Sequence, residues 1–374
     1  MNILVTGADG FIGKNLVSRL HELPEFVVTT FARGDSDEVL KNKLFKVETI
    51  IHLAGENRPA NDEGFQIGNV DLTYRLCNFL RELKRPIRLI VSSSAQASLD
   101  NAYGRSKLAA EACLEAFVED SDSLVIIYRL PGVFGKWCKP NYNSVVATFC
   151  HNIANDLPIT VNDSSGELTL VYIDDVIDSF VSCLCEDRST GLLRKSVAPE
   201  YRTSVGDLAN QLEKFGHCRN ELLIEGVGKG FTRALYSTYI SYFPKDKFQY
   251  QIPSHEDARG VFVEMLKTKD SGQFSFFTAH PGITRGGHYH NTKTEKFLVI
   301  KGNAHFRFQH ILTAEIFSLD TSGKTPTIVE SIPGWIHDIT NKGDDELIVM
   351  LWANEIFDHD KPDTISRTIE NEKT

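Results

Sequence analysis

The chain opens with MNILVTGADGFIGKNL (residues 1–16), and this stretch decides the fold expected of its N-terminal half. The apolar run ILV predicts a buried strand, and the helical spacing of apolar residues in FIGKNLVSRLHEL (residues 11–23) predicts a helix directly after it. Between the two lie three glycines in a GxxGxxG pattern: Gly7, Gly10 and Gly13. Glycines at this place allow a tight turn and let the backbone approach the pyrophosphate of a dinucleotide at the helix N-terminus. The stretch therefore predicts a nucleotide-binding α/β domain.

Nearly continuous apolar runs alternate with helical patterns up to residue 135. Five of these runs have the composition of parallel strands buried on both faces: NILVTG (2–7), VVTTFAR (27–33), ETIIHLAG (48–55), IRLIVSSS (87–94) and LVIIYRLPGVFG (124–135). Helical patterns such as NVDLTYRLCNFLRELKR (69–85) separate them. This alternation predicts a Rossmann-like, doubly wound parallel sheet.

The pattern changes towards the C-terminus. Residues 140–243 mix helix and strand patterns, which predicts a smaller and mostly helical lobe. Beyond them the chain reads as short strands such as KFLVIKG (296–302), separated by turn signals such as NKGDD (341–345). Such spacing is typical of an all-β barrel or sandwich. We therefore expect two domains, residues 1–243 and residues 244–374.

Composition narrows the classes of function. The formal net charge is -10 and there is no basic block, so nothing supports binding to nucleic acid or to an anionic membrane. No apolar run reaches the roughly 18 residues that a membrane span needs, and the N-terminus lacks a signal-peptide pattern. The seven cysteines form no CxxC pair, and their odd number suits no disulfide framework. We expect reduced thiols in a cytoplasmic protein.

The end of the second predicted strand selects the cofactor. An acidic residue there binds the ribose 2′-hydroxyl of NADH, whereas an arginine suits the 2′-phosphate of NADPH. The run VVTTFAR ends at Arg33, and Asp35 follows two residues later. The sequence therefore favours NADPH, with NADH as the alternative.

A tyrosine and a lysine follow the VSSS strand end in the stretch SSSAQASLDNAYGRSK (92–107). Tyr103 and Lys107 stand four apart, so they share one face of a helix. A nearby ammonium favours the phenolate form, which prepares Tyr103 for proton transfer. A serine hydroxyl at the strand end is placed to polarise a substrate carbonyl.

These motifs together resemble the extended short-chain dehydrogenase/reductase family of nucleotide-sugar enzymes. The resemblance covers residues 1–240 and rests on GxxGxxG, HLAG (52–55), GNVDLT (68–73), VSSS (91–94), YGRSK (103–107), RLPGVFG (129–135) and YIDDV (172–176). It implies a cofactor-binding set of Gly7, Gly10, Phe11, Ile12, Gly13, Arg33, Leu53, Ala54, Gly55, Asn69, Tyr103 and Lys107.

The same resemblance implies the catalytic roles. Tyr103 is the expected proton donor, Lys107 the residue that adjusts its pKa and holds the ribose, and Ser94 the hydrogen-bond donor to the carbonyl. Ser93 is the alternative, because the link from the serines to Tyr103 is shorter than in most relatives.

A second group of chemically active residues lies in GITRGGHYHNTKTEKFLVIKG (282–302). Alternate residues of a strand face the same side, so His288 and His290 face one cavity. Glu295 returns to that cavity on the next strand, and His337 supplies a fourth ligand from a later one. Three imidazoles and a carboxylate suit Zn²⁺, or another divalent ion such as Mn²⁺, Fe²⁺ or Ni²⁺.

This spacing resembles the first cupin motif, and PGWIHDITN (333–341) resembles the second. HEDARGVFVE (255–264) and ITRGGHYH (283–290) also resemble the metal-free 3,5-epimerases of deoxy-sugar nucleotides, in which the histidine of RGxHY is the catalytic base. That histidine corresponds to His288, which is therefore either a metal ligand or the base. In the second case, the metal rests on His290, Glu295 and His337.

A short-chain reductase joined to a cupin resembles the bifunctional reductase/epimerases that make UDP-2-acetamido-2,6-dideoxy-L-talose, a precursor of N-acetyl-L-fucosamine in capsule and O-antigen synthesis. The resemblance implies a UDP-linked 4-keto-6-deoxy-HexNAc substrate and a homodimer. Inversion at C3 needs the C4 ketone to acidify the C–H bond, and reduction removes that ketone. We therefore expect the cupin to epimerise C3 before the N-terminal domain reduces C4.

Three alternatives remain at this point. One is a single-activity 4-ketoreductase with a structural or sugar-binding cupin. Another is a 4-epimerase or 4,6-dehydratase that uses bound NAD without net redox change. The third is a non-enzymatic redox sensor or scaffold, which the intact Ser94, Tyr103 and Lys107 oppose.

Overall fold

The computed structural model describes the chain except residues 187–189, 254, 258–259, 263–265, 269–271, 356–359 and 371–374. Contacts divide the chain into two compact units: residues 1–144 with 168–202, and residues 145–167 with 203–374.

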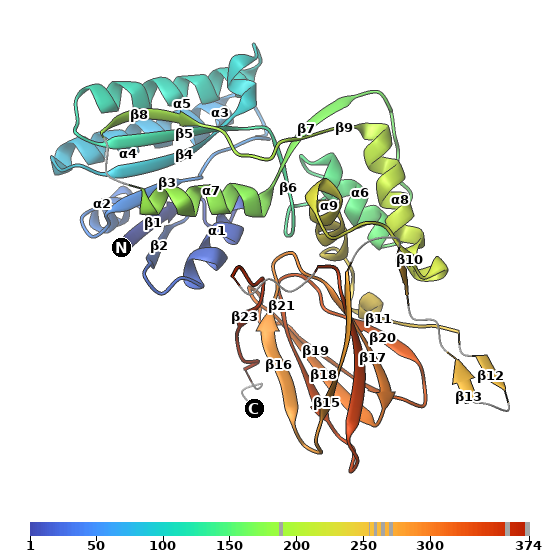
Figure 1. The fold of residues 1–374 in the computed structure, drawn as a ribbon. Helices are drawn as coiled ribbons and strands as arrows, with labels where there is room; N and C mark the ends of the chain where they lie inside the picture. The colour runs from blue at the N-terminus through green and yellow to red at the C-terminus, as the bar shows by residue number, and fades with distance from the viewer. Residues whose placement is uncertain are drawn as a thin grey trace. The chain divides into compact units, whose positions relative to one another are not determined.

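A six-stranded parallel sheet forms the centre of the first unit (Figure 1). Its strands, in spatial order, are β2 (Val27–Phe31), β1 (Asn2–Thr6), β3 (Thr49–His52), β4 (Arg88–Ser94), β5 (Leu124–Leu130) and β8 (Gly191–Lys195). Successive residues of the inner strands are buried, as Ile50 and Ile51 are, because helices cover both faces. The predicted doubly wound sheet is confirmed.

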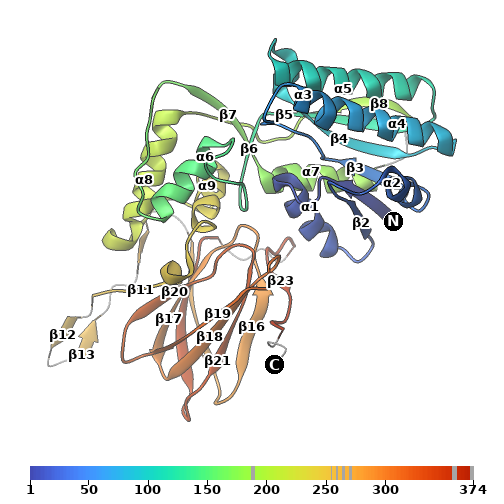
Figure 2. The same cartoon turned by 180° about the vertical axis from the view of Figure 1, so that it is seen from behind.

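Helices line both faces of this sheet. Figures 1 and 2 show α4 (Leu72–Leu83) and α5 (Ala102–Glu119) on one face, and α1 (Phe11–His21) and α7 (Ile173–Cys185) on the other. The unit also contains the helical segments α2 (Asp37–Leu44), α3 (Glu63–Phe65), η1 (Gln66–Asp71) and η2 (Ala95–Ser98), and the parallel strands β6 (Gly132–Phe134) and β7 (Glu167–Tyr172).

The strand order locates the ligand crevice. β1 pairs with β2 on one side and with β3 on the other, so the order of the strands across the sheet reverses direction at β1. Ligands of open α/β sheets bind outside the carboxyl ends of the strands at such a switch point. The carboxyl ends of β1 and β3 carry the GADG and HLAG segments, and this places both motifs at the crevice.

The second unit combines three helices with the β-rich C-terminal half. α6 (Val145–Ala154), α8 (Val205–Glu221) and α9 (Gly230–Ile240) pack against one another, and Ser237 Oγ of α9 donates to the Thr292 carbonyl at 2.5 Å. By contacts, the helical lobe thus belongs with the C-terminal strands. The functional boundary at residues 243 and 244 stays a prediction. β9 (Tyr201–Ser204), β10 (Leu223–Ile224) and η3 (Lys245–Phe248) complete these connections.

Two five-stranded antiparallel sheets make up the β-rich part. The first has the order β11 (Gln249–Gln251), β20 (Thr327–Glu330), β17 (Glu295–Lys301), β22 (Leu347–Ala353) and β15 (Gln273–Ala279). The second has the order β19 (Ile316–Ser322), β18 (Asn303–His310), β21 (Trp335–Asn341), β16 (Thr284–Tyr289) and β23 (Ile365–Ser366). Short strands β12 (His255–Asp257), β13 (Gly260–Phe262) and β14 (Lys267–Thr268) lie before β15.

The core of this part lies between the two sheets. Phe297 of β17 and Phe306 of β18 are both buried, and their ring centroids are 5.8 Å apart. The predicted all-β domain is confirmed, with the fold of a cupin. Within the described residues, no helix is long and apolar enough to cross a membrane.

Candidate functional site

Close packing of the backbone requires glycine at two positions of the turn between β1 and α1. Gly7 has a φ of +71°, and a Cβ atom there would lie 2.6 Å from the backbone nitrogen of Ala54. A Cβ atom on Gly13 would lie 2.1 Å from the Gly7 carbonyl oxygen. The turn and the HLAG segment after β3 therefore approach each other without side chains between them.

The N-terminus of helix α1 has no side-chain cap. Its N-cap residue, Gly10, makes no side-chain capping bond, and the first turn, which starts with Phe11 and Ile12, contains no acidic residue. The first N–H groups of a helix lack intrahelical partners and favour negative charge. The turn and the helix end thus fit the pyrophosphate of a dinucleotide.

At the end of β2, Arg33 and Asp35 lie in different surroundings. Arg33 is 89% exposed in its side chain and forms an ion pair with Glu56 at 2.9 Å, and Glu56 follows HLAG directly. The Asp35 carboxylate accepts the Ala32 N–H at 3.1 Å and Lys43 Nζ at 3.1 Å, and these bonds lower its pKa. The acid is therefore engaged locally, while the guanidinium projects from the strand end.

The two candidate serines point to different partners. Ser94 acts on Tyr103 and lowers its pKa, whereas the Ser93 hydroxyl donates to the buried carboxylate of Glu111 at 2.5 Å. Adjacent residues of a strand face opposite sides, so only one of the two serines faces the tyrosine. The pairing supports Ser94 over Ser93, and the catalytic role itself stays a prediction.

Tyr103 and Lys107 lie on one face of α5, with Lys107 Nζ at 5.9 Å from the centroid of the tyrosine ring. Burial raises the pKa of Tyr103, and the Ser94 hydrogen bond only partly opposes this. Burial lowers the pKa of Lys107 to about 8, although the nearby Glu111 carboxylate raises it. The expected lowering of the tyrosine pKa is therefore not found here, because desolvation outweighs the effect of Ser94.

Asn69 connects the cofactor motifs. Its side-chain oxygen accepts the Glu56 N–H at 2.8 Å, and its amide donates to the Glu56 carbonyl at 2.8 Å and to Ser106 Oγ at 3.0 Å. A Cβ atom on Gly55 would lie 2.8 Å from this oxygen and 3.1 Å from Lys107 Nζ. The HLAG segment and Asn69 are thus held beside Lys107.

Sequence reasoning missed the ion pair between Glu111 and Arg129, which lies one helical turn beyond Lys107 on α5. Glu111 is 2% exposed and accepts three hydrogen bonds from the Arg129 guanidinium, of 3.0 and 3.2 Å from Nε and 2.7 Å from Nη2. The signal was available, since Glu111 follows Lys107 by four residues and shares its helix face. Its partner Arg129 stands in the RLPGVFG segment.

The four predicted metal ligands meet in the second unit. One donor atom from each lies within 4.8 Å of all the others, and these atoms belong to His288, His290, Glu295 and His337. Glu295 Oε2 lies 3.0 Å from His290 Nε2 and 3.3 Å from His337 Nε2. Three imidazoles and a carboxylate are the donor set of zinc and of similar divalent ions, so the residues fit such an ion.

Burial and charge shape this cluster. Burial raises the pKa of Glu295, but the two histidines outweigh it and hold that pKa well below its usual value. Burial, together with His337 and His290, lowers the pKa of His288 to about 3. His288 and Glu295 are therefore in the forms that ligate a cation, a neutral imidazole and a carboxylate.

One predicted segment lies partly beyond the described residues. In HEDARGVFVE, residues 258–259 and 263–264 are outside the described part of the chain, including the arginine of the motif. The backbone of β12 and β13 forms an antiparallel pair on either side of the gap.

Two family models match the chain. The NAD dependent epimerase/dehydratase family matches residues 3–191, and the polysaccharide biosynthesis C-terminal domain matches residues 255–365. A dinucleotide cradle in the first match and a four-donor cluster in the second define the class, a two-domain enzyme of polysaccharide biosynthesis.

Relatives cover the whole chain. It is 54% identical over 369 residues to a UDP-2-acetamido-2,6-beta-L-arabino-hexul-4-ose reductase of Pseudomonas aeruginosa, covering 99% of both chains. The capsular polysaccharide assembling protein CapF from Staphylococcus aureus is 40% identical, with a TM-score of 0.68 and coverage of 99% of this chain and 100% of CapF. The chain belongs to the family that contains this nucleotide-sugar reductase and CapF.

A more distant structure bears on the fold alone. UDP-glucuronic acid 4-epimerase from Bacillus cereus, solved in complex with NAD, is 19% identical, with a TM-score of 0.51. The match covers 57% of this chain and 84% of the epimerase.

Proposed function

We propose that the chain is a bifunctional enzyme that epimerises C3 of a UDP-2-acetamido-2,6-dideoxy-4-keto-hexose and then reduces C4 to give UDP-2-acetamido-2,6-dideoxy-L-talose. The observation that carries the proposal is the 54% identity, from end to end, to a reductase named for a hexul-4-ose substrate. Such a substrate contains the ketone on which both steps depend. A cytoplasmic location, as expected from the sequence, suits an enzyme that uses UDP-linked sugars and NADPH.

Reduction belongs to the first unit. NADPH, when bound, supplies the hydride that adds to C4. Tyr103 donates the proton to the carbonyl oxygen, and Ser94 hydrogen-bonds the same oxygen as negative charge develops on it. Lys107 lies on the same helix face as Tyr103, where its ammonium stabilises the phenolate left behind. Arg33, exposed at the end of β2, supports NADPH over NADH.

Epimerisation belongs to the second unit. His290, Glu295 and His337 would hold a divalent ion such as Zn²⁺, which would supply a Lewis acid for the enolate oxygen. His288 is either a further ligand or the base that removes the C3 proton before a proton returns on the opposite face. Its place among the four converging donor atoms supports the ligand role.

The same observation favours a second candidate, a single-activity reductase with a structural metal. Four protein ligands close a tetrahedral zinc site, whereas a catalytic site keeps one position open for substrate. The two candidates differ in whether the C3 hydrogen exchanges with solvent.

One experiment tests both activities. The protein is mixed with a UDP-4-keto-6-deoxy-HexNAc and NADPH in deuterated water, and the product is analysed by NMR. The proposal expects hydrogen from NADPH at C4 and deuterium at C3. Hydrogen at both positions supports the single-activity reductase, and no net consumption of NADPH supports a 4-epimerase or a dehydratase.

We further propose a homodimer formed through the β-rich part. β15 is the last strand of its sheet within the described residues, and its Phe274 and Phe276 are 45% and 70% exposed. Edge strands with exposed apolar side chains pair with other chains unless something covers them. Light scattering on the wild type and on Phe276→Glu tests this, with a shift to monomer expected for the variant.

A further inference from the structure

The loop between the metal-ligand strands is held by side chains at every amide. This ligand loop, residues 291–294, joins His290 at the end of β16 to Glu295 at the start of β17. The N–H groups of residues 294 and 295 donate to Asn354 Oδ1 at 2.9 Å and to Ser331 Oγ at 2.8 Å. Those of residues 291–293 all donate to one carboxylate.

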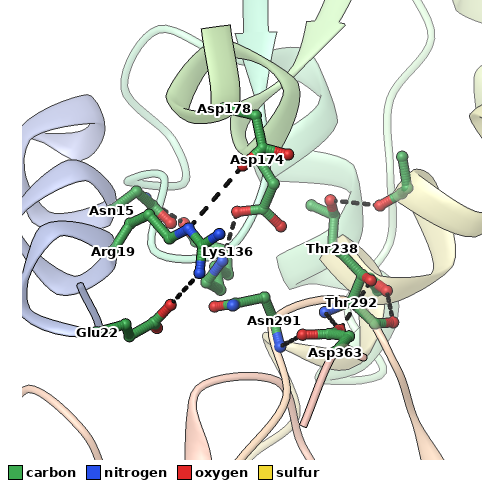
Figure 3. Close-up of polar contacts among 12 residues, drawn as sticks. Asn15, Arg19, Glu22, Lys136, Asp174, Asp178, Thr238, Asn291, Thr292 and Asp363 are labelled. Carbon is green, nitrogen blue, oxygen red and sulfur yellow. Dashed lines mark hydrogen bonds and ion pairs between the residues drawn. The ribbon is translucent and has the colours of Figure 1, made fainter. Parts of the chain in front are cut away.

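That carboxylate belongs to Asp363. Its oxygens accept the N–H groups of Asn291 at 2.9 Å, Thr292 at 2.6 Å and Lys293 at 2.8 Å, and also the Thr292 hydroxyl at 2.9 Å (Figure 3). Hydrogen bonds to an ionised acceptor are among the strongest in proteins. A single side chain, about 70 positions away in sequence, thus fixes the loop between two metal ligands.

The backbone of Asp363 acts on a ligand directly. Its carbonyl oxygen contacts His290 Nδ1, and a carbonyl only accepts, so Nδ1 carries the hydrogen. The other nitrogen, Nε2, is then the one that faces Glu295. Outer partners of this kind fix the tautomer and the orientation of a metal-binding histidine.

Residues 363–370, here called the C-terminal strap, anchor this carbonyl. Ile365 and Ser366 form β23 and pair with Tyr289 and His288 of β16, and Ile369 is 4% exposed. The Arg367 N–H donates to the Gly287 carbonyl at 2.9 Å. The strap therefore runs along β16, which contains His288 and ends one residue before His290.

We propose that Asp363 is a positioning residue for the metal centre. Its carboxylate holds the ligand loop, and its backbone carbonyl, anchored by the C-terminal strap, fixes the tautomer of His290. The proposal rests on the metal centre of the proposed function. It concerns residues outside the ligand set and predicts how tightly the cluster binds an ion, rather than which reaction follows.

Three variants of the full chain test the role of Asp363. Asp363→Ala removes all four hydrogen bonds from the loop, and Asp363→Asn keeps one acceptor oxygen. Asp360→Asn removes the same charge from an exposed residue three positions earlier and serves as the matched control. Zn²⁺ affinity is measured by competition with a chromophoric chelator. The visible spectrum of the Co²⁺-loaded protein reports the coordination geometry, and thermal melting of the metal-free protein reports folding.

We expect Asp363→Ala to weaken Zn²⁺ binding by about 10- to 100-fold, the usual effect of losing an outer partner, and to change the Co²⁺ spectrum. Asp363→Asn should give a smaller loss with a folded metal-free protein, and Asp360→Asn should match the wild type. A merely structural role would lower the melting temperature and leave the Zn²⁺ affinity of Asp363→Asn unchanged, which overturns the proposal. A wild type that binds neither ion overturns the metal centre itself, and the role of Asp363 with it.

Discussion

Beyond the end of β2, Arg33 forms an ion pair with Glu56, and under the proposed function this arginine selects the cofactor. A guanidinium that is free to meet a 2′-phosphate contributes a charge-assisted hydrogen bond, worth about 1.5–3 kcal/mol. We expect Arg33→Ala to weaken NADPH binding by about 10-fold or more at this energy and to leave NADH binding nearly unchanged. Glu56→Gln should have the opposite effect, because the carboxylate competes with the phosphate for Arg33.

Fluorescence titration of both variants with NADPH and NADH measures this effect. Arg75→Ala is the matched control, since Arg75 is also an exposed arginine paired with a carboxylate, that of Asp37 at 2.8 Å. Equal weakening of the two cofactors by Arg33→Ala would contradict the assignment.

His288 has two candidate roles that a single substitution separates. If it is a ligand, His288→Gln lowers Zn²⁺ affinity and C3 deuterium exchange together, because the ion loses one of its donors. If it is the base, exchange falls by about 100-fold or more while Zn²⁺ affinity stays near the wild-type value. The convergence of the four donor atoms leads us to expect the first outcome. Chelator competition and NMR exchange on one preparation provide the two measurements.

At the scale of elements, a buried histidine ties β1, β3 and α4 together. His52 Nδ1 lies 2.7 Å from the Thr6 hydroxyl, and Nε2 lies 3.1 Å from the Thr73 hydroxyl. Burial, assisted by the charge of Lys107, lowers its pKa to about 3. In the unfolded chain His52 is therefore protonated below about pH 6.5, whereas in the folded chain it is protonated only below about pH 3.

This difference makes stability fall as the pH drops below 6.5. His52 alone should lower the free energy of unfolding by about 2 kcal/mol between about pH 7.5 and about pH 5. In urea titrations at both pH values, His52→Gln should lose stability overall yet show a pH dependence smaller by that amount. His21→Gln, at an exposed position near the end of α1, should keep the wild-type dependence. If the dependence of His52→Gln also matches the wild type, the histidine does not titrate as described.

The elements show why some features were predictable from sequence. The GxxGxxG turn, the YxxxK pair and the HxH pattern each place their residues by local geometry, within one turn of helix or one pair of strand positions. Strand and helix periodicity was strong enough to predict the parallel sheet and the all-β domain. These features follow from short-range rules and need no knowledge of distant partners.

Other parts of the sites depend on distant contacts. Asp363 stands in DHDKPDT (358–364), which resembles a solvated charge run, and its partners are about 70 positions away. Ser93 and Ser94 differ only in which side of β4 they face, and the register of one strand decides that. The contact of the helical lobe with the C-terminal strands rests on pairs such as Ser237 and Thr292, which no local pattern marks.

At the scale of the whole molecule, the proposed order of the two reactions has a direct consequence. Proton exchange at C3 needs the ketone and no hydride, so it continues when reduction is blocked. We expect Tyr103→Phe to lower C4 reduction by about 100- to 10,000-fold, because the proton donor is lost. The same variant should still place deuterium at C3, as observed by NMR of the unreduced substrate in deuterated water.

The reciprocal variant completes the test. Glu295→Gln removes the anionic ligand, so it should abolish C3 exchange while NADPH binding stays at the wild-type level, since Glu295 lies in the other compact unit. With Glu295→Gln, any NADPH consumed should yield a product that retains the original C3 hydrogen. Loss of exchange in Tyr103→Phe would place epimerisation in the first unit and contradict the assignment of the cupin as the earlier active site. Exchange that survives in Tyr103→Phe and disappears in Glu295→Gln is the pattern that two separate sites acting in sequence on one ketone must give.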